Sequence, residues 1–293
     1  MSLHALFFEQ IFFDRFDNLL YIVNANQTNM INGKKVVVVL PAYNAAKTLE
    51  KTYREIDFEI VDDVILVDDA SKDNTVAVAE ALGITHIIKH DRNKGYGGNQ
   101  KSCYNYSLKI GADIVIMLHP DYQYNPKLIP SMAYLIGNGV FHVVLGSRIL
   151  GDRAMLNGMP VYKYIFNRVL TWTQNVIVWE KLSEYHTGYR AFSREVLEKV
   201  NYNANDDDFI FDNQMLTQIF YEGYEIGEIS CPAKYFDDAS SINFRRSMKY
   251  GLGVIGNSIL FRLNKWGVIK SEIYQPRQSI ISAESKSEQI SLP

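Results

Sequence analysis

The 293-residue chain contains only two cysteines, Cys103 and Cys231, which lie far apart and match no metal-binding spacing. A disulfide-dense secreted scaffold is therefore excluded, and a reducing cytoplasmic environment is favoured. An excess of positive charge is missing too, since 30 basic residues stand against 33 acidic ones and the net charge is −3. The overall charge therefore gives no argument for binding nucleic acid.

Long apolar runs are also absent. No stretch reaches the roughly 18–20 uninterrupted apolar residues that a bilayer-spanning helix needs. The longest candidates are 251–261, which Arg262 ends, and 3–23, which four charged residues interrupt. The N-terminus has neither a basic start nor a small-residue cleavage site, so it does not resemble a signal peptide. We expect no simple membrane span, while contact with a membrane surface stays open.

The two ends of the chain differ in pattern from its middle. Residues 3–23 carry apolar side chains three and four positions apart, which predicts an amphipathic helix that packs against the main domain or a partner subunit. With a polar linker, this N-terminal extension covers residues 1–33. Residues 241–270 contain six basic residues and no acidic one, and predict a helix on an anionic membrane surface or packed against the domain. The polar, Ser-rich residues 271–293 are expected to be disordered.

Between these ends, residues 34–240 alternate β-branched runs with amphipathic segments. The expected strands are 36–40, 61–67, 84–89, 114–118, 140–145 and 225–230, and the expected helices include 45–57, 160–179 and 209–222. This alternation predicts an α/β fold, an open and mostly parallel twisted sheet flanked by helices. In such sheets, ligands bind outside the carboxyl ends of the strands.

Three of the expected strands end in residues suited to binding. Pro41-Ala42-Tyr43-Asn44 follows the first strand, Asp68-Asp69 the second and the segment HPDYQ, residues 119–123, the fourth. Two adjacent carboxylates at a buried strand end are costly without partners. One of them is explained by a turn that caps a helix, and the other can accept hydrogen bonds from a nucleobase or ribose.

His119, Asp121 and Gln123 alternate, so their side chains would point the same way if the segment were extended. Imidazole, carboxylate and amide oxygen are all ligands for Mn²⁺ or Mg²⁺. A loop with a buried histidine and a capping aspartate explains the same residues, and the spacing alone leaves both interpretations open.

Further candidates contact phosphate. The glycine loop that starts at Lys94 can cradle a phosphate or simply supply a turn with positive φ. Arg148, in GSR, and Arg190, in HTGYR, are phosphate contacts or ordinary salt-bridge partners, with Glu228 as a counter-ion for either.

Taken in order, these segments resemble the inverting family 2 glycosyltransferases with the GT-A fold, and among them the dolichyl- or polyprenyl-phosphate sugar transferases. The resemblance runs from about 35 to 250 and rests on LPAYN at 40–44, LVDDASKDNT at 66–75, NKGYG at 93–97, MLHPDYQ at 117–123, GSR at 146–148, HTGYRAF at 186–192 and GEI at 227–229.

The resemblance implies a UDP- or GDP-linked sugar donor and, as acceptor, a polyprenyl phosphate or a cell-envelope glycan intermediate. The implied nucleotide contacts are Pro41, Ala42, Tyr43, Asp68, Asp69 and Lys94. HPDYQ stands where the family has its metal motif, so His119, Asp121 and Gln123 would hold Mg²⁺ or Mn²⁺. The implied catalytic residues are Asp121, Arg148 and Arg190. The implied location is the cytoplasm, peripheral to the membrane.

Two departures from the family pattern leave alternatives open. Ala45 stands where the family often has Glu, and His119 replaces the first Asp of the metal motif. A non-catalytic nucleotide-sugar-binding relative is one alternative. Another is a transferase that acts on a sugar hydroxyl, with Asp207, Asp208 or Asp212 as the base. The sugar is not determined by the sequence, and a homodimer stays open.

Overall fold

The computed structural model describes residues 31–151, 154–156, 158–232 and 244–277. The expected amphipathic helix at 3–23 lies outside these residues, as does most of the expected C-terminal tail. The described part of the linker belongs to the folded domain, because Ile31 is buried and pairs with Lys34 in an isolated bridge.

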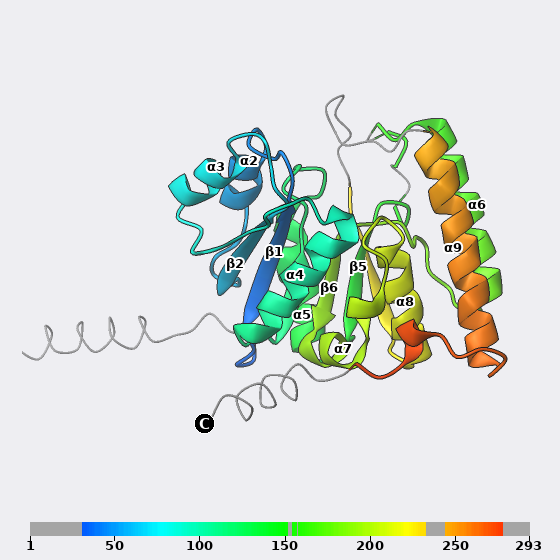
Figure 1. Ribbon diagram of the computed structural model, residues 1–293. Helices are drawn as coiled ribbons and strands as arrows, with labels where there is room; N and C mark the ends of the chain where they lie inside the picture. Colours follow the sequence, from blue (N-terminus) through cyan, green and yellow to red (C-terminus); the bar gives the residue numbers. More distant parts are fainter. Residues whose placement is uncertain (1–30, 152–153, 157, 233–243, 278–293) are drawn as a thin grey trace, which may run out of the picture.

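A seven-stranded sheet forms the centre of the molecule (Figure 1). Its strands are β1 (Val36–Ala42), β2 (Asp63–Asp68), β3 (His86–Lys89), β4 (Ile114–Met117), β5 (Val143–Ser147), β6 (Arg190–Ser193) and β7 (Ile226–Ser230). The spatial order is β3-β2-β1-β4-β6-β5-β7, and β6 alone among these strands runs antiparallel to its neighbours. The predicted open, mostly parallel α/β sheet is confirmed, and the antiparallel β6 is an addition to it.

Helices cover both faces of this sheet. One face carries α2 (Leu49–Arg54), α3 (Thr75–Ala81) and α5 (Ile129–Gly137), and the other carries α4 (Gly95–Lys109), α7 (Arg194–Lys199) and α8 (Phe211–Tyr221). Val37 and Val39 of β1 pack toward α4 and α8, while Val36, Val38 and Leu40 pack toward α2 and α5. Burial on both faces explains why β1 is an uninterrupted apolar run.

Two long helices, α6 (Val161–Val178) and α9 (Phe244–Lys265), lie side by side along one end of the molecule (Figure 1). The helix α9 contacts both α6 and α8, so the pair forms a layer outside α8. Within the described residues, no helix combines the length and the apolar content that crossing a bilayer requires.

Three short 3₁₀ turns complete the structure, at Pro126–Leu128, Tyr202–Ala204 and Glu272–Tyr274. The last of them corrects the prediction of a disordered tail, which is wrong for residues 271–277. Ile273 and Tyr274 are buried, and the Tyr274 hydroxyl donates a hydrogen bond to Thr217 Oγ1 in α8 at 3.0 Å. Two apolar side chains thus anchor a segment whose average composition is polar.

Candidate active site

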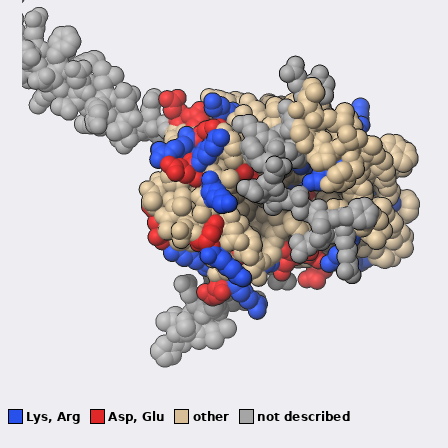
Figure 2. Space-filling model, turned by 90° about the horizontal axis from the view of Figure 1, so that it is seen from above, with Lys and Arg blue, Asp and Glu red and all other residues tan. Residues whose placement is uncertain are grey.

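The predicted binding segments lie along one edge of the sheet. The strands β1, β2 and β4 are parallel neighbours, and Ala42 at the end of β1 pairs with Asp68 at the end of β2. Because β6 is antiparallel, Arg190 at its beginning pairs with Met117 at the end of β4 and with Leu145 in β5. Figure 2 looks down on this edge and shows the surface hollowed near its centre.

The loops after β1 and β2 are joined to one another. Asn44 Oδ1 accepts the Lys72 N–H at 2.8 Å, and Ser71 Oγ accepts the Asn44 N–H at 2.8 Å. Ala42 is buried, whereas the Tyr43 side chain is exposed. Pro41, Ala42 and Tyr43 therefore form a fixed wall with an aromatic ring available at its rim.

Asp68 and Asp69 have different environments, although both are buried. Asp69 is fully engaged by the protein, since its carboxylate accepts the N–H groups of Lys94 and Gly95, at 2.8 and 3.1 Å, and contacts His90 Nδ1 at 2.7 Å. Asp68 accepts the Ser71 N–H through Oδ2 at 3.0 Å, and its buried Oδ1 has no hydrogen-bond partner among the described residues. Asp68 thus keeps an acceptor oxygen for a ligand, and Asp69 holds the glycine loop in place.

The glycines after Lys94 lie in the first turn of α4 and pack against another loop. Gly97 and Gly98 donate their N–H groups to the Asp207 carbonyl at 2.7 and 3.3 Å. A Cβ on Gly97 would lie 2.5 Å from the Asp206 carbonyl oxygen, and one on Gly95 would lie 2.6 Å from that of Asp207. These glycines permit close contact between two protein segments, so their N–H groups are already used. The phosphate contact by Lys94 stays a prediction.

The HPDYQ segment is a turn rather than the extended segment on which the predicted alternation depended. Tyr122 has a φ of 61°, and Asp121 Oδ1 accepts the Gln123 N–H at 3.1 Å. The three proposed metal ligands therefore do not project from a strand. All three remain partly accessible at the edge of the sheet.

His119 belongs to a network that the sequence did not indicate. Its ring stacks on Tyr96, with 5.5 Å between the ring centroids, and its Nε2 lies 3.2 Å from the Tyr96 hydroxyl. That hydroxyl donates its proton to Asp212 Oδ2 at 2.8 Å, so His119 Nε2 must be the donor to Tyr96. Burial lowers the pKa of His119, which favours the neutral imidazole. Nδ1 is then the nitrogen with a lone pair to offer.

Arg148 follows β5 and is held by Glu184. Its Nε donates to Glu184 Oε1 at 2.9 Å, its Nη2 contacts the same carboxylate, and its backbone N–H donates to Oε2 at 2.7 Å. Burial alone would raise the pKa of Glu184, but the Arg148 guanidinium and its hydrogen bonds outweigh this and hold that pKa below its usual value. Asn167 of α6 donates to Glu184 Oε1 at 2.8 Å. A charged arginine is thus fixed at the same edge of the sheet as the other candidate residues.

Arg190 is fully buried. Its guanidinium nitrogens donate to the carbonyls of Thr187 at 2.8 Å, Asp212 at 2.8 Å and Tyr185 at 3.0 Å. These contacts join the 185–190 loop to the beginning of α8. A catalytic role for Arg190 stays a prediction, and the geometry favours a role in positioning Asp212 and the loop.

Glu228 is not a counter-ion of either arginine among the contacts that the structure gives. It accepts the Ser183 N–H and hydroxyl, at 2.8 and 2.6 Å, and so fixes the residue next to Glu184. Of the three base candidates, Asp207 pairs with Lys101 at 2.7 Å and Asp208 is exposed, whereas Asp212 is buried and has no partner for Oδ1 among the described residues.

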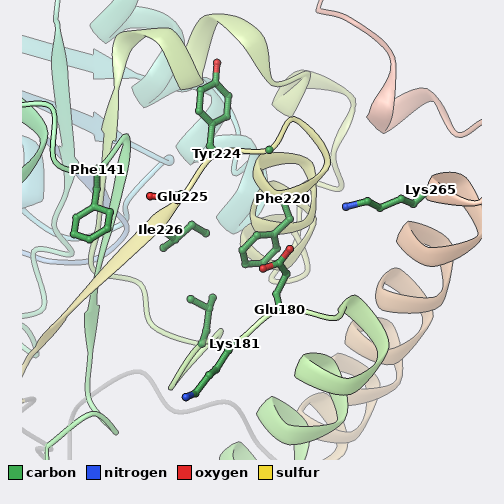
Figure 3. Close-up of a pocket in the computed structure, with 10 residues that line it drawn as sticks. Phe141, Glu180, Lys181, Phe220, Tyr224, Glu225, Ile226 and Lys265 are labelled. Carbon is green, nitrogen blue, oxygen red and sulfur yellow. The ribbon is translucent and has the colours of Figure 1, made fainter.

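The described residues also line a pocket of about 440 Å³ away from this edge (Figure 3). It lies beside the amino ends of β5 and β7, where Phe141 and Ile226 meet the C-terminal ends of α8 and α9. Figure 3 shows Lys265 of α9 directed toward Phe220 and Glu180. Because none of the predicted site residues lines it, this pocket is separate from the candidate active site.

The residues at the edge fit a divalent cation that is shared with a substrate. The Asp121 carboxylate, the Gln123 amide oxygen and the His119 imidazole are suitable donors. Across the residues that the structure describes, no three His, Cys, Asp or Glu side chains converge into a complete metal cage. Mg²⁺ that is bound by one or two carboxylates and by the phosphates of a substrate would not need such a cage, and the metal assignment to His119, Asp121 and Gln123 stays a prediction.

Comparison with known proteins decides the family. The sequence matches the Glycosyl transferase family 2 model over residues 37–200, more than half of the chain. The chain belongs to glycosyl transferase family 2. Its fold and family membership make it a glycosyltransferase, and the predicted GT-A fold is confirmed by solved structures.

Two curated relatives are close in length to this family 2 chain. It is 27% identical to UDP-N-acetylglucosamine--dolichyl-phosphate N-acetylglucosaminyltransferase of Methanococcus voltae, with 78% of this chain and 95% of the relative covered. It is 20% identical to polyprenol monophosphomannose synthase of Mycolicibacterium smegmatis, over 80% of this chain and 88% of the relative. Among solved structures, glucosyl-3-phosphoglycerate synthase of Mycobacterium tuberculosis, with Mn²⁺, UDP-glucose and glycerol 3-phosphate, has a TM-score of 0.59 at 17% identity, with 82% of each chain covered.

Proposed function

We propose that this family 2 enzyme transfers a sugar, with inversion, from a nucleoside diphosphate sugar to a polyprenyl phosphate at the cytoplasmic face of a membrane. The observation that carries the proposal is the position of Arg148. Glu184 fixes its guanidinium on the same edge of the sheet as Asp68 and Asp121. The curated relatives that act on dolichyl phosphate and polyprenol support this choice of acceptor.

The donor would bind across the ends of β1, β2 and β4. Tyr43 offers an aromatic face to the base, and Asp68 Oδ1 offers an acceptor to a base or ribose N–H or O–H group. The diphosphate would then extend toward Asp121 and Gln123. UDP is the nucleotide with which the related synthase of known structure was crystallised, so UDP-linked sugars are the first donors to test.

A divalent cation held by Asp121 and Gln123, with His119 Nδ1 as a further donor, would neutralise the charge that develops on the departing diphosphate. The chain's own residues provide the remaining chemistry. The acceptor phosphate is already anionic, so its oxygen attacks the anomeric carbon without a base, while the bond from that carbon to the diphosphate oxygen breaks. Arg148 would orient the attacking phosphate by charge-assisted hydrogen bonds.

A transfer assay tests this proposal. UDP-N-acetylglucosamine, UDP-glucose and GDP-mannose are each incubated with the protein, a short-chain polyprenyl phosphate and Mg²⁺ or Mn²⁺, and the lipid product is detected by mass spectrometry. We expect one donor to be used and Arg148→Lys to lose most of the activity, because lysine cannot keep the contacts with Glu184 and the His186 carbonyl and bind the phosphate at the same time. Arg168→Lys, an exposed arginine of α6, is the matched control. No transfer to the phosphate acceptor with any donor would contradict the proposal.

A sugar hydroxyl is the second candidate acceptor, and one observation favours it. Asp212 has a buried oxygen without a partner among the described residues, beside the Tyr96–His119 pair. A hydroxyl acceptor needs a base, which Asp212 would supply. Asp212 also pairs with the buried Arg190 at 3.6 Å, so the stability of Asp212→Asn is measured by urea titration beside its activity. In the folded variant, transfer to a hydroxyl should be abolished and transfer to a phosphate should stay largely intact.

A further inference from the structure

The helix α6 places most of its apolar side chains outward and three polar ones inward, unlike an ordinary surface helix. Its buried face carries the polar residues Asn167, Thr171 and Gln174 together with two apolar ones, Leu170 and Val178. Its exposed face carries apolar side chains three or four residues apart, and this face continues onto Trp179 just after the helix. These side chains are between 53% and 82% exposed: Val161, Ile165, Val169, Trp172, Val176 and Trp179. A helix that faced only water would place such side chains inward.

Hydrogen bonds among α6, α8 and α9 explain why the polar side chains of α6 face inward. Asn213 of α8 donates to Gln174 Oε1 at 3.1 Å, and Gln174 donates to Ser258 of α9 at 3.3 Å. Asn257 of α9 donates to Asn213 Oδ1 at 2.8 Å. These bonds engage amide groups that would be costly to bury alone, although Asn257 Oδ1 has no partner among the described residues. The polar seam fixes which face of α6 points outward.

The tryptophans of the chain belong to the same helix pair. The sequence contains three, and all lie on or next to the α6–α9 pair: Trp172 is 67% exposed, Trp179 is 82% exposed and Trp266 is 68% exposed. Tryptophan is the side chain that concentrates where lipid meets water, because its ring is apolar and its N–H is polar.

The charge of the pair is of one sign. Neither α6 nor α9 contains an Asp or Glu, although the whole chain has a net charge of −3. Arg168 and Lys249 are exposed. Toward the right edge of Figure 2, where the pair lies, tan predominates and the charged atoms in view are mostly blue. An apolar surface bordered by cations complements an anionic lipid surface.

The pair is also joined to the residues that we assign to the acceptor phosphate. Asn167 of α6 contacts Glu184, which holds Arg148. Tyr250 of α9 lies 2.9 Å from His186 Nδ1, and the His186 carbonyl accepts from Arg148 at 2.8 Å. The exposed Leu156 lies on the segment between Arg148 and α6.

From these observations we infer that the outer surface of α6 and α9 binds an anionic lipid bilayer and lies in its interface without crossing it. The inference rests on the proposed function, because the polyprenyl phosphate acceptor would be embedded in a bilayer. The bound pair places Arg148 beside the headgroup layer, where a polyprenyl phosphate presents its phosphate.

The test uses the full chain and vesicles that contain no acceptor, so that it does not depend on activity. Vesicles of phosphatidylcholine with phosphatidylglycerol are compared with vesicles of phosphatidylcholine alone. We expect co-sedimentation with the anionic vesicles and a blue shift of tryptophan emission. The variant Ile165→Glu/Val169→Glu/Val176→Glu should bind about tenfold more weakly or worse. Val140→Glu, a comparably exposed valine before β5, is the matched control and should bind like wild type.

Failure of this inference is distinguishable from failure of the proposed function. Equal vesicle binding by wild type and the triple variant, or no binding by wild type, would overturn it. So would a wild-type dimer, seen by analytical ultracentrifugation without lipid, that the triple variant converts to monomer. Transfer to a water-soluble short-chain polyprenyl phosphate, measured without vesicles, tests the proposed function separately. We expect the triple variant to keep that activity and to lose transfer to a long-chain acceptor embedded in vesicles.

Discussion

The sheet with its flanking helices and the α6–α9 pair bury opposite kinds of side chain. In the sheet, Val36 to Leu40 are completely buried and the polar residues lie at the strand ends. In the helix pair, amides and hydroxyls share the inside with a few apolar side chains such as Val178 and Val254, and most of the valine, isoleucine and tryptophan side chains of α6 lie outside. The first region is built to fold in water and to bind a polar ligand at one edge. The second is built to meet an apolar phase, which is why the two should respond differently to the same substitution.

The largest effect is expected where the two regions meet, at Arg148 and Glu184. Arg148→Met leaves the buried Glu184 carboxylate without its main partner, and we expect a loss of about 3–5 kcal/mol in the free energy of unfolding. Urea titration measures it. Arg148→Met/Glu184→Gln should recover most of the stability without recovering transfer. If the double variant were no more stable than the single one, the pair would not be the link between the regions.

Asp121→Asn should affect only the region at the strand ends. Without this carboxylate, binding of the divalent cation at the diphosphate weakens, and we expect turnover to fall by about 10²–10³-fold while the melting temperature changes little. Asp91→Asn, an exposed aspartate in the loop after β3, is the control. Vesicle binding should be the same as in wild type for both variants. Full turnover by Asp121→Asn would remove this residue from the proposed cation site.

Truncation of one apolar residue in each region compares them directly. Leu66→Ala, in the buried strand β2, should cost about 2–5 kcal/mol, since it leaves a cavity. Val169→Ala, on the exposed face of α6, should change the stability in lipid-free buffer by no more than about 0.5 kcal/mol. Chemical denaturation measures both. A cost above 1 kcal/mol for Val169→Ala would show that its side chain is covered in the lipid-free protein.

The same contrast explains how much the sequence could predict. The apolar run of β1 and the polar residues after β1, β2 and β4 are local patterns, so the fold class and the edge that carries the site followed from them. The strand β6 escaped notice because it begins with Arg190 and runs antiparallel to its neighbours, which an alternation of strands and helices does not predict. The Tyr96–Asp212 contact joins residues 116 positions apart, and Glu184 reaches Arg148 from a loop. Such pairings depend on the folded topology, which no local spacing encodes.

The inversion of α6 was visible in the sequence only as an amphipathic pattern. Periodicity shows that a helix has an apolar and a polar face, but it does not show which face points outward. The usual assumption, that apolar side chains face the core, assigns α6 wrongly. The amides of Gln174, Asn213 and Asn257 decide the orientation, and they come from three different helices.

A smaller effect than that of Leu66→Ala concerns the contact between α9 and the loop that carries Glu184. Burial, aided by Arg148 and Arg190, lowers the pKa of His186 to about 4, while Glu184 opposes the shift. Because its pKa is lower in the folded than in the unfolded protein, the stability contribution is present above pH 6.5 and is lost as the pH falls toward 4. Between pH 8 and pH 5.5 we expect His186 to account for about 1 kcal/mol of the loss in unfolding free energy. His186→Asn should reduce the pH dependence of the unfolding free energy over this interval by that amount, measured by urea titration at both pH values. An unchanged pH dependence would mean that water reaches the imidazole and that Tyr250 does not shield it.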